Sequence, residues 1–481
     1  MEHEVAWKKY DEVDLEALEG LASNYIDFIS ENKTERRCAA TAIRMAEKAG
    51  YVSLAHAVRE GRTLSAGDKV WAHSHGKALI LVQLGSKPLS EGMNILGAHI
   101  DSPRLDLKQN PLYESNGFAL LDTHYYGGIK NYQWVTLPLA MHGVIAKKDG
   151  TVVDINVGDD EGDPVFCVSD LLIHLASQQM DKKGNKIVEG EDLDILIGNR
   201  PLSLNGEGAE DEDASEGTEG AKSKDAAKEP VKAFALKLLA DKYGIEEADF
   251  LSAEIEMVPA GRARELGFDR SMVIGYGQDD RVCAYTSLAA QLAAPADLAK
   301  TAVCVLVDKE EIGSVGATGM ASNFFENTIA EIMELAGEGG MLALRRALSA
   351  SSMLSSDVSA GFDPAYASVF EPKNAAFLGR GLVFNKYTGA RGKSGSNDAS
   401  AEYVARVRRV MDDAGVSFQT AELGKVDAGG GGTIAYLPAK YGMDVIDSGV
   451  AVLSMHAPWE VTSKADIYEA YKGYLAFLEN A

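Results

Sequence analysis

Residues 301–314, read as TAVCVLVDKEEIGS, join a run of apolar and small side chains to a run of charged ones. A short apolar run that ends at charged residues and glycine is typical of a buried strand. Glu310 and Glu311 follow this predicted strand after Asp308 and Lys309. Adjacent carboxylates are costly there unless a positive charge lies beside them. The chemistry of this protein therefore depends on what supplies that positive charge.

Helical and strand patterns alternate in both terminal parts of the chain. Two helices are predicted within residues 14–50, the second capped by Thr34 and ended by Gly50, and buried strands are predicted at 78–84 and 94–100. After about residue 264 the pattern returns, with strands predicted at 301–307, 416–423 and 449–455 and helices at 327–337, 397–415 and 463–474. This alternation favours an α/β fold.

The middle of the chain differs, because β-rich segments separated by glycine and proline follow one another from about residue 107. One predicted helix, SDLLIHLASQQM at 169–180, interrupts them. We therefore expect one domain formed by residues 1–106 and 264–481, with a second, β-rich domain at 107–263 inserted into it.

Residues 205–232 contain almost no apolar side chains and carry a dense acidic cluster. A segment of this composition cannot bury enough surface to order itself, so a disordered loop is expected. An acidic interaction segment is the functional alternative.

The composition argues against two classes of partner. With 72 acidic and 47 basic residues, the formal charge is −25, which would repel a nucleic-acid backbone. The N-terminal sequence lacks the layout of a signal peptide, and no apolar run approaches membrane-spanning length. Four scattered cysteines without a C-x-x-C pair are typical of buried thiols in a reducing compartment. We expect a soluble cytoplasmic protein without nucleic-acid or membrane partners.

Five short stretches place ionisable side chains at the ends of predicted strands. They are GAHIDSPRLD with His99 and Asp101, GQDDRVCAY with Asp279 and Asp280, DKEEIGS with Glu310 and Glu311, SSDVSAG with Asp357, and LSMHAPWE with His456. Each alone is more typical of a cap or a satisfied core residue. Together they form a set of histidines and carboxylates, and strand ends are where ligands of open α/β sheets gather.

Such a set fits two divalent, zinc-like ions about 3.5–4 Å apart. Imidazole and carboxylate are zinc ligands, and one shared carboxylate would give each ion three protein ligands and a position for a shared water. If the strand extends through Asp101, then His99 and Asp101 face the same side, and Asp101 could hold the second nitrogen of the imidazole. Neighbouring glutamates point apart on an extended chain, so one would be a ligand and the other a base.

In this order, HIDSPRLD, the acidic pair in GQDD, DKEEIGS, SSD and SMHAPWEVTSKAD resemble the aspartyl aminopeptidase family of dinuclear zinc metallopeptidases, in its bacterial branch. The resemblance covers nearly the whole chain apart from the acidic segment. The fold expected with it is a three-layer α/β/α catalytic domain with a mixed sheet and an inserted β-rich dimerisation domain.

The resemblance also implies roles for individual residues. The implied metal ligands are His99, Asp279, Glu311, Asp357 and His456. Glu310 is implied as the general base. Asp101 is implied as the residue that orients the neighbouring metal ligand, His99. Asp279 is implied as the shared ligand, but many family members have Asp-Asn where this chain has Asp279-Asp280, so Asp280 stays an alternative. His174, in IHL, is similar to a family histidine that reaches the active site of a neighbouring subunit.

Three basic residues in the C-terminal half of the chain are candidates for substrate binding. GARGKSGSND at 389–398 is no phosphate-binding loop, because Tyr387 stands where that motif requires glycine. Lys386, Arg391 and Lys393 could instead meet a substrate carboxylate, with a solvated loop as the alternative. The glycine-rich stretch at 427–438 permits close approach to a ligand or is a flexible turn.

These observations predict a metallo-aminopeptidase that removes one residue from the free N-terminus of a peptide. The family name implies Asp or Glu at that position, although no residue proves an acidic pocket. The expected cofactors are two zinc ions per subunit, with cobalt or manganese as alternatives, and the resemblance implies a homododecamer built from dimers. The rivals are a dinuclear deacylase or dipeptidase and a catalytically silent assembly protein of the same fold.

Overall fold

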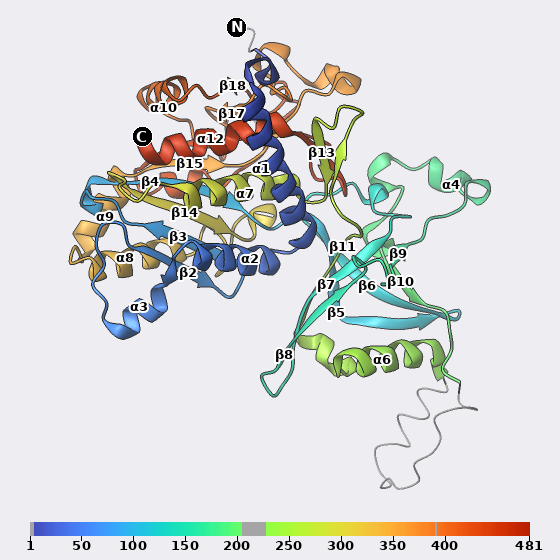
Figure 1. The fold of residues 1–481 in the computed structure, drawn as a ribbon. Coiled ribbons are helices and arrows are strands. Elements are labelled where there is room, and N and C mark those ends of the chain that lie inside the picture. The colour runs from blue at the N-terminus through green and yellow to red at the C-terminus, as the bar shows by residue number, and fades with distance from the viewer. Residues whose placement is uncertain (1–3, 204–227, 390–391) are drawn as a thin grey trace. The chain divides into compact units, whose positions relative to one another are not determined.

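The computed structural model describes residues 4–203, 228–389 and 392–481. The chain forms two compact units, one made of residues 1–102 and 262–481 and the other of residues 103–261 (Figure 1). Most of the predicted acidic loop and the predicted substrate residue Arg391 lie outside the described residues.

A nine-stranded mixed sheet is the centre of the first unit. Its strands, in spatial order, are β1 (Val52–Ser53), β2 (Lys69–Ser74), β3 (Ala78–Gln83), β14 (Thr301–Val307), β4 (Met93–His99), β15 (Ser352–Ser356), β19 (Asp444–Gly449), β17 (Leu382–Asn385) and β18 (Phe418–Thr420). The four central strands β14, β4, β15 and β19 are parallel, whereas β3 and β17 run antiparallel to them. Their carboxyl ends therefore lie along one edge of the sheet.

Both faces of this sheet are buried, as alternation along β14 shows. Ala302, Cys304 and Leu306 belong to one apolar cluster, and Val303 and Val305 belong to another. The first cluster includes side chains of α1 (Glu12–Glu31), α2 (Glu35–Lys48), α7 (Gln278–Ala293), α10 (Ala401–Asp413) and α12 (Lys464–Asn480). The second includes side chains of α3 (Leu54–Glu60), α8 (Phe324–Leu335), α9 (Met341–Ala350) and α11 (Tyr436–Ala439). The predicted three-layer α/β/α arrangement with a mixed sheet is confirmed (Figure 1).

Local sequence signals located several of these elements. The strands predicted at 78–84, 94–100 and 301–307 are β3, β4 and β14. The predicted cap Thr34 precedes α2, and its hydroxyl oxygen accepts a hydrogen bond from the Arg37 backbone N–H at 3.3 Å. This bond satisfies one of the amides that a helix start leaves without an internal partner.

A small five-stranded sheet also belongs to the first unit. Its order is β12 (Arg264–Leu266), β13 (Met272–Gly275), β21 (Glu460–Ser463), β20 (Ala451–Leu453) and β16 (Ser359–Ala360). The antiparallel pairing of β13 with β21 brings residues 272–275 beside residues 460–463. Because β13 leads directly into α7, this pairing places the start of α7 near the start of β21.

The second unit is built on a seven-stranded sheet in which every pairing is antiparallel. The order is β8 (Val152–Val157), β7 (Leu139–Ala146), β11 (Ala253–Pro259), β5 (Arg104–Ser115), β6 (Phe118–Tyr126), β10 (Ile195–Gly198) and β9 (Cys167–Val168). The helix α6 (Pro230–Tyr243) packs against this sheet (Figure 1). Residues 230–232, expected to belong to the acidic loop, are therefore helical.

The continuous helix predicted at 169–180 is wrong. Only a 3₁₀ turn, Ile173–Leu175, and a short helix α4, Ser177–Met180, form there. Leu171, Leu172, Ile173 and Leu175 are nearly consecutive, so they cannot share one face of a helix, and all four are exposed. Among the helices of the described residues, none combines the length and the apolar character needed to cross a bilayer.

Candidate metal centre

Side chains from five separate segments meet near the carboxyl edge of the nine-stranded sheet, and one of them, His456, lies between β20 and β21. His99 is the last residue of β4, Asp279 stands in the first turn of α7, and Asp357 directly follows β15. Glu310 and Glu311 begin a 3₁₀ turn, Glu310–Ile312, shortly after β14. Because β14, β4 and β15 are adjacent and parallel, their carboxyl ends bring these residues together, as open α/β sheets commonly do.

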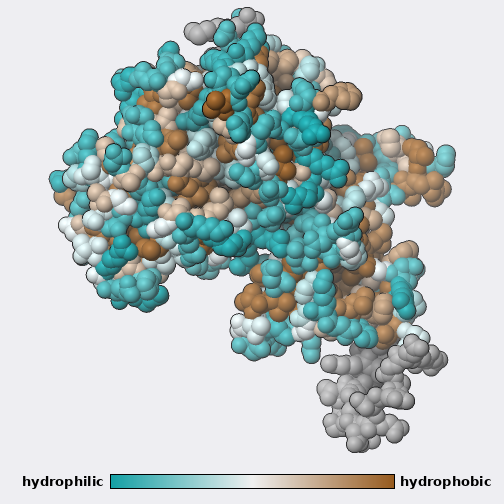
Figure 2. Space-filling view, in the orientation of Figure 1, coloured by the Kyte–Doolittle hydropathy of each residue, from teal (hydrophilic) through white to brown (hydrophobic). Residues whose placement is uncertain are grey.

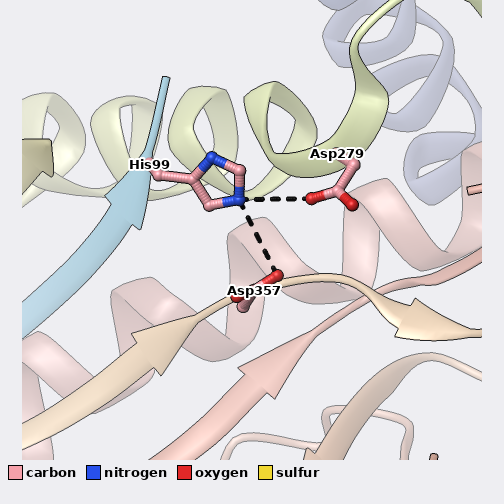
Figure 3. Close-up of side chains that lie close together, drawn as sticks. All are labelled: His99, Asp279 and Asp357. Carbon is pink, nitrogen blue, oxygen red and sulfur yellow. Dashed lines mark ion pairs between the residues drawn. The ribbon is translucent and has the colours of Figure 1, made fainter. Parts of the chain in front are cut away.

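Asp279 lies between two imidazoles. Its Oδ1 is 3.2 Å from Nε2 of His99, and its Oδ2 is 3.2 Å from Nε2 of His456. Asp357 lies at the same end of the His99 ring, with Oδ1 4.0 Å from the same Nε2 (Figure 3). Glu311 lies beside His456, with Oε2 3.7 Å from Nε2. Asp279 is thus placed to be shared by two groups of ligands.

Three groups of three donor atoms lie within 4.8 Å of one another in the described part of the chain. Two of them share Asp279: one adds His99 and Asp357, and the other adds Glu311 and His456. The third group joins His99 to both Glu310 and Glu311. Imidazole and carboxylate donors at this spacing match the ligand preference of zinc, so the residues present fit a zinc site.

The carboxylates of this centre lack sufficient positive charge from the protein itself. Burial, together with neighbouring acidic groups, raises the pKa of Asp357 and of Glu311 well above their usual range. Oε1 of Glu311 is buried without a hydrogen-bond partner. Buried acceptors without donors are expected where a cation completes the site. A cation beside the two adjacent glutamates would supply the positive charge that these buried acceptors need.

Two groups of the centre have pKa shifts of opposite sign. Burial alone would raise the pKa of Asp279, but hydrogen bonds with His456 and His99 outweigh it and lower the pKa. For Glu310, burial raises the pKa to about 7, with His99 acting in the opposite direction. Asp279 therefore stays ionised, whereas burial favours the protonated form of Glu310.

Asp101 contacts the site differently from the way the strand pattern suggested. The strand β4 ends at His99, so a shared strand face does not align the two residues. Nevertheless Oδ1 of Asp101 lies 3.3 Å from Nδ1 of His99. Its two oxygens also accept hydrogen bonds from the backbone N–H groups of Glu310 and Glu311, each at 3.2 Å.

The expectation that Glu310 and Glu311 point apart is wrong. They lie in a 3₁₀ turn, preceded by Lys309 in the left-handed region at φ 69°, rather than on an extended chain. Their carboxylate oxygens consequently both lie in one group with His99. Side-chain exposure distinguishes them, at 16% for Glu310 and 2% for Glu311.

Asp280 is buried beside this centre without joining any of the three donor groups of the described residues. Its Oδ2 accepts a hydrogen bond from the backbone N–H of His99 at 3.4 Å. Asp279, not Asp280, therefore faces both imidazoles.

Glu460 is a residue that the sequence analysis missed. Its Oε1 accepts a hydrogen bond from the backbone N–H of His456 at 2.8 Å, and its Oε2 accepts one from the backbone N–H of Asp279 at 3.1 Å. The only sequence signal was its position four residues after His456 in LSMHAPWE. Nothing in the sequence linked it to Asp279.

The other predicted residues lie outside the donor groups. Lys386 and Lys393 both form ion pairs with Asp398, and these hydrogen bonds lower the pKa of Asp398. The loop that carries them is tied to the glycine-rich stretch by a hydrogen bond from the Gly389 backbone N–H to the Gly431 carbonyl oxygen at 2.6 Å. His174 is exposed and belongs to the second unit.

Residues 28–478 match the family described as aminopeptidase I zinc metalloprotease (M18). The chain belongs to this M18 family. An aminopeptidase of this family is a metallo-hydrolase, and the match agrees with the family named from the sequence motifs. The donor set described above therefore lies in a zinc metalloprotease.

Relatives of known name support the same M18 membership. A Clostridium acetobutylicum protein named "Probable M18 family aminopeptidase 1" is 58% identical over 479 residues, covering 100% of this chain and 98% of that protein. The crystal structure of aminopeptidase I from the same organism has a TM-score of 0.88 at 55% identity, with 100% of both chains covered. A crystal structure of an M18 aminopeptidase from Thermotoga maritima has a TM-score of 0.90 at 42% identity, again with 100% of both chains covered.

A more distant solved structure shares the fold alone. The S. cerevisiae mApe1 dodecamer has a TM-score of 0.74 at 19% identity, with 95% of this chain and 96% of that chain covered.

Proposed function

We propose that this M18 aminopeptidase binds two metal ions and uses Glu310 as a general base to release the N-terminal residue of a peptide. The observation that carries the proposal is the position of Asp279, whose two oxygens each lie 3.2 Å from a different histidine. A carboxylate in that position can serve two ions at once. One ion would be held by His99, Asp279 and Asp357, and the other by Asp279, Glu311 and His456.

Bound zinc ions at these two positions would polarise the scissile carbonyl group and acidify water. The side chains of the protein perform the proton transfers. Glu310 accepts the proton of the attacking water at a carboxylate oxygen and returns it to the leaving amine.

Asp101 keeps the base and its neighbour in position. The carboxylate accepts hydrogen bonds from the Glu310 and Glu311 backbone, which fixes the 3₁₀ turn at the end of β14. The same carboxylate lies against Nδ1 of His99 and leaves Nε2 to face Asp279 and Asp357. An imidazole held in this way presents one defined nitrogen to a metal.

An acidic N-terminal residue is the proposed substrate feature. Lys386 and Lys393 both pair with Asp398 in the described part of this loop, so these three side chains together carry one more positive than negative charge. Both lysine side chains are about half-exposed, at 47% and 44%, and can turn toward an incoming carboxylate.

We also propose that the active enzyme is a homo-oligomer, with a dodecamer built from dimers as the expected form. Apolar side chains are exposed around the turn that carries His174, and Figure 2 shows apolar residues gathered near α4. The exposed side chains are Leu171, Leu172, Ile173, Leu175 and Met180. A cluster of this kind on a globular protein is typical of a contact surface. In such an assembly His174 would reach a neighbouring subunit's site.

A substrate panel tests the proposed function. The full-length protein is supplied separately with Zn²⁺, Co²⁺ or Mn²⁺ and given peptides that start with Asp, Glu, Ala, Leu or Lys. Stepwise release from free N-termini, fastest for Asp or Glu, is expected, with no release from the matched N-acetylated peptides. Cleavage of N-acyl amino acids in preference to longer free peptides would instead support a deacylase, and absence of both metal binding and hydrolysis would support a silent assembly protein.

A further inference from the structure

One buried carboxylate, Glu460, joins two of the proposed ligand segments through their main chain. Oε1 accepts the His456 N–H at 2.8 Å, and Oε2 accepts the Asp279 N–H at 3.1 Å. Asp279 and Glu460 are 181 residues apart in sequence. Neither hydrogen bond involves the side chain of a proposed ligand. Glu460 can therefore fix the position of the ligand backbone without competing with the metal for the ligand side chains.

The turn at His456 needs such support. His456 has φ 66° and Ser454 has φ 58°, so two non-glycine residues of this turn occupy the left-handed region. Conformations of this kind are unfavourable for residues other than glycine and persist only where surrounding contacts hold them. The hydrogen bond from the His456 N–H to Glu460 is such a contact, and it acts at the strained residue itself.

Glu460 is in turn held from two sides. It is the first residue of β21 and pairs with Gly275, the last residue of β13. Its backbone carbonyl oxygen accepts a hydrogen bond from Nε2 of Gln278 at 2.6 Å, and the same nitrogen donates to the Val273 carbonyl oxygen at 3.1 Å. Tyr25 donates its hydroxyl to Oε1 of Gln278 at 3.1 Å. A buried carboxylate anchored in this way has little freedom to follow a shifted ligand.

We infer that Glu460 is a positioning residue that sets the separation of Asp279 and His456 and so determines the affinity of the metal position they share with Glu311. The inference rests on the proposed function, because it assumes that these side chains hold metal. It predicts that the loss of one acceptor oxygen of Glu460 lowers the metal affinity more than it lowers the stability of the fold. Loss of a hydrogen-bonding partner behind a metal ligand commonly costs about 10–100-fold in metal affinity.

Glu460→Gln and Glu460→Asp are the two test variants. Glutamine keeps the shape but replaces one acceptor oxygen by a donor, and aspartate keeps the charge but is too short to reach both amides. Glu469→Gln is the matched control. Glu469 is equally buried and accepts hydrogen bonds from the Ser417 backbone N–H at 2.7 Å and the Tyr10 hydroxyl at 2.8 Å, and neither partner is a proposed ligand.

Three measurements on metal-free full-length protein separate positioning from a structural role. Competitive Zn²⁺ titration measures the affinity of each position, the visible absorption spectrum after Co²⁺ loading reports ligand geometry, and thermal unfolding reports the fold. Both Glu460 variants should lose about 10-fold or more in affinity at one of the two positions and show an altered Co²⁺ spectrum. Glu469→Gln should keep the wild-type affinity and spectrum even where its melting temperature falls.

Two outcomes overturn the inference in distinguishable ways. Wild-type protein that binds no metal would remove the proposed function and this inference with it. Wild-type protein that binds two ions, together with Glu460 variants of unchanged affinity and Co²⁺ spectrum, would remove the inference alone. Hydrogen–deuterium exchange of the wild-type chain supplies a test that requires no folded variant: the His456 and Asp279 amides should be protected even without metal, and fast exchange at either would contradict the role.

Discussion

Oδ1 of Asp101 accepts a hydrogen bond from the backbone N–H of Glu310 at 3.2 Å, across 209 positions of sequence. This bond connects the loop after β4 to the turn after β14, two neighbouring parallel strands. The proposed base is therefore positioned through its main chain, and its carboxylate stays free for chemistry.

Glu310→Gln should lower kcat by about 10²-fold or more while the metal content stays at the wild-type value. Glutamine has nearly the same shape but cannot accept the proton of water. Metal analysis by plasma mass spectrometry beside steady-state kinetics checks both parts. Turnover near the wild-type rate would show that another group is the base.

Glu311→Gln should behave differently, because its carboxylate lies 3.7 Å from His456 and is proposed as a ligand. An amide is a poorer zinc ligand than a carboxylate, so the bound metal per subunit should fall. Equal metal content in the Glu310 and Glu311 variants would contradict this division of roles. An equal fall in both would show that Glu310 is itself a ligand, as the third donor group allows.

His174→Phe should lower kcat strongly, with unchanged metal content and oligomer size. A histidine that donates a hydrogen bond to a developing oxyanion typically contributes a few kcal/mol to the barrier, and phenylalanine cannot donate. Steady-state kinetics, metal analysis and size-exclusion chromatography check the three quantities.

Mixing His174→Phe subunits with Glu310→Gln subunits should restore part of the activity. A mixed dimer can combine Glu310 of one chain with His174 of the other in one complete site. Mass spectrometry of differently tagged chains verifies that mixed oligomers form. Mixed oligomers without recovered activity would return His174 to a purely structural role.

Ile173→Glu should shift the protein to smaller oligomers in sedimentation velocity experiments. Ile173 is 68% exposed among other apolar side chains, and a charge there is costly to bury in a contact between subunits. Phe118→Glu, at a singly exposed apolar side chain of the same unit, is the control and should leave the oligomer unchanged. Identical sedimentation of both variants would place the contact surface elsewhere.

Lys464→Met should lower the free energy of unfolding by about 1 kcal/mol near neutral pH. Lys464 is 1% exposed and pairs with Glu19 at 2.5 Å and Glu265 at 2.7 Å. Both glutamates are partly exposed, so water compensates for part of the loss. Lys237→Met, which breaks the exposed pair with Asp241, should cost less.

The Lys464 effect should depend on pH in a predictable direction. A hydrogen bond with Lys464 lowers the pKa of Glu265 below its ordinary 4.5, so this stabilisation is present above about pH 4.5 and is lost as the pH falls through the folded-state pKa. Burial would lower the pKa of Lys464, but hydrogen bonds with Glu19 and Glu265 raise it above 10.5, so the loss on the alkaline side begins above that pH. Thermal unfolding at pH 3, 7 and 9 should show a smaller difference from wild type at pH 3 than at pH 7 and 9.

Local patterns in the sequence determined much of the α/β framework. The apolar run at 301–307 is long enough for one strand and too short for most helices. The bounds predicted for this strand are therefore those of β14 in the structure. Thr34 marked the start of α2 because a hydroxyl before a helical pattern satisfies free amides. The helix predicted at 169–180 was wrong because its apolar residues are nearly consecutive. Such a run has no helical or strand period, and only the structure shows that these side chains are exposed.

The sequence by itself determined which residue types are available for metal chemistry and that they follow strands. Only the tertiary structure decided which of them meet. Asp279 and Asp280 are indistinguishable as neighbours in sequence, yet the path of the chain at the start of α7 turns the first toward His99 and His456 and the second toward the backbone of β4. Glu460 became visible only through the pairing of β13 with β21, because a hydrogen bond between residues 181 positions apart depends on strand register, which no local pattern encodes.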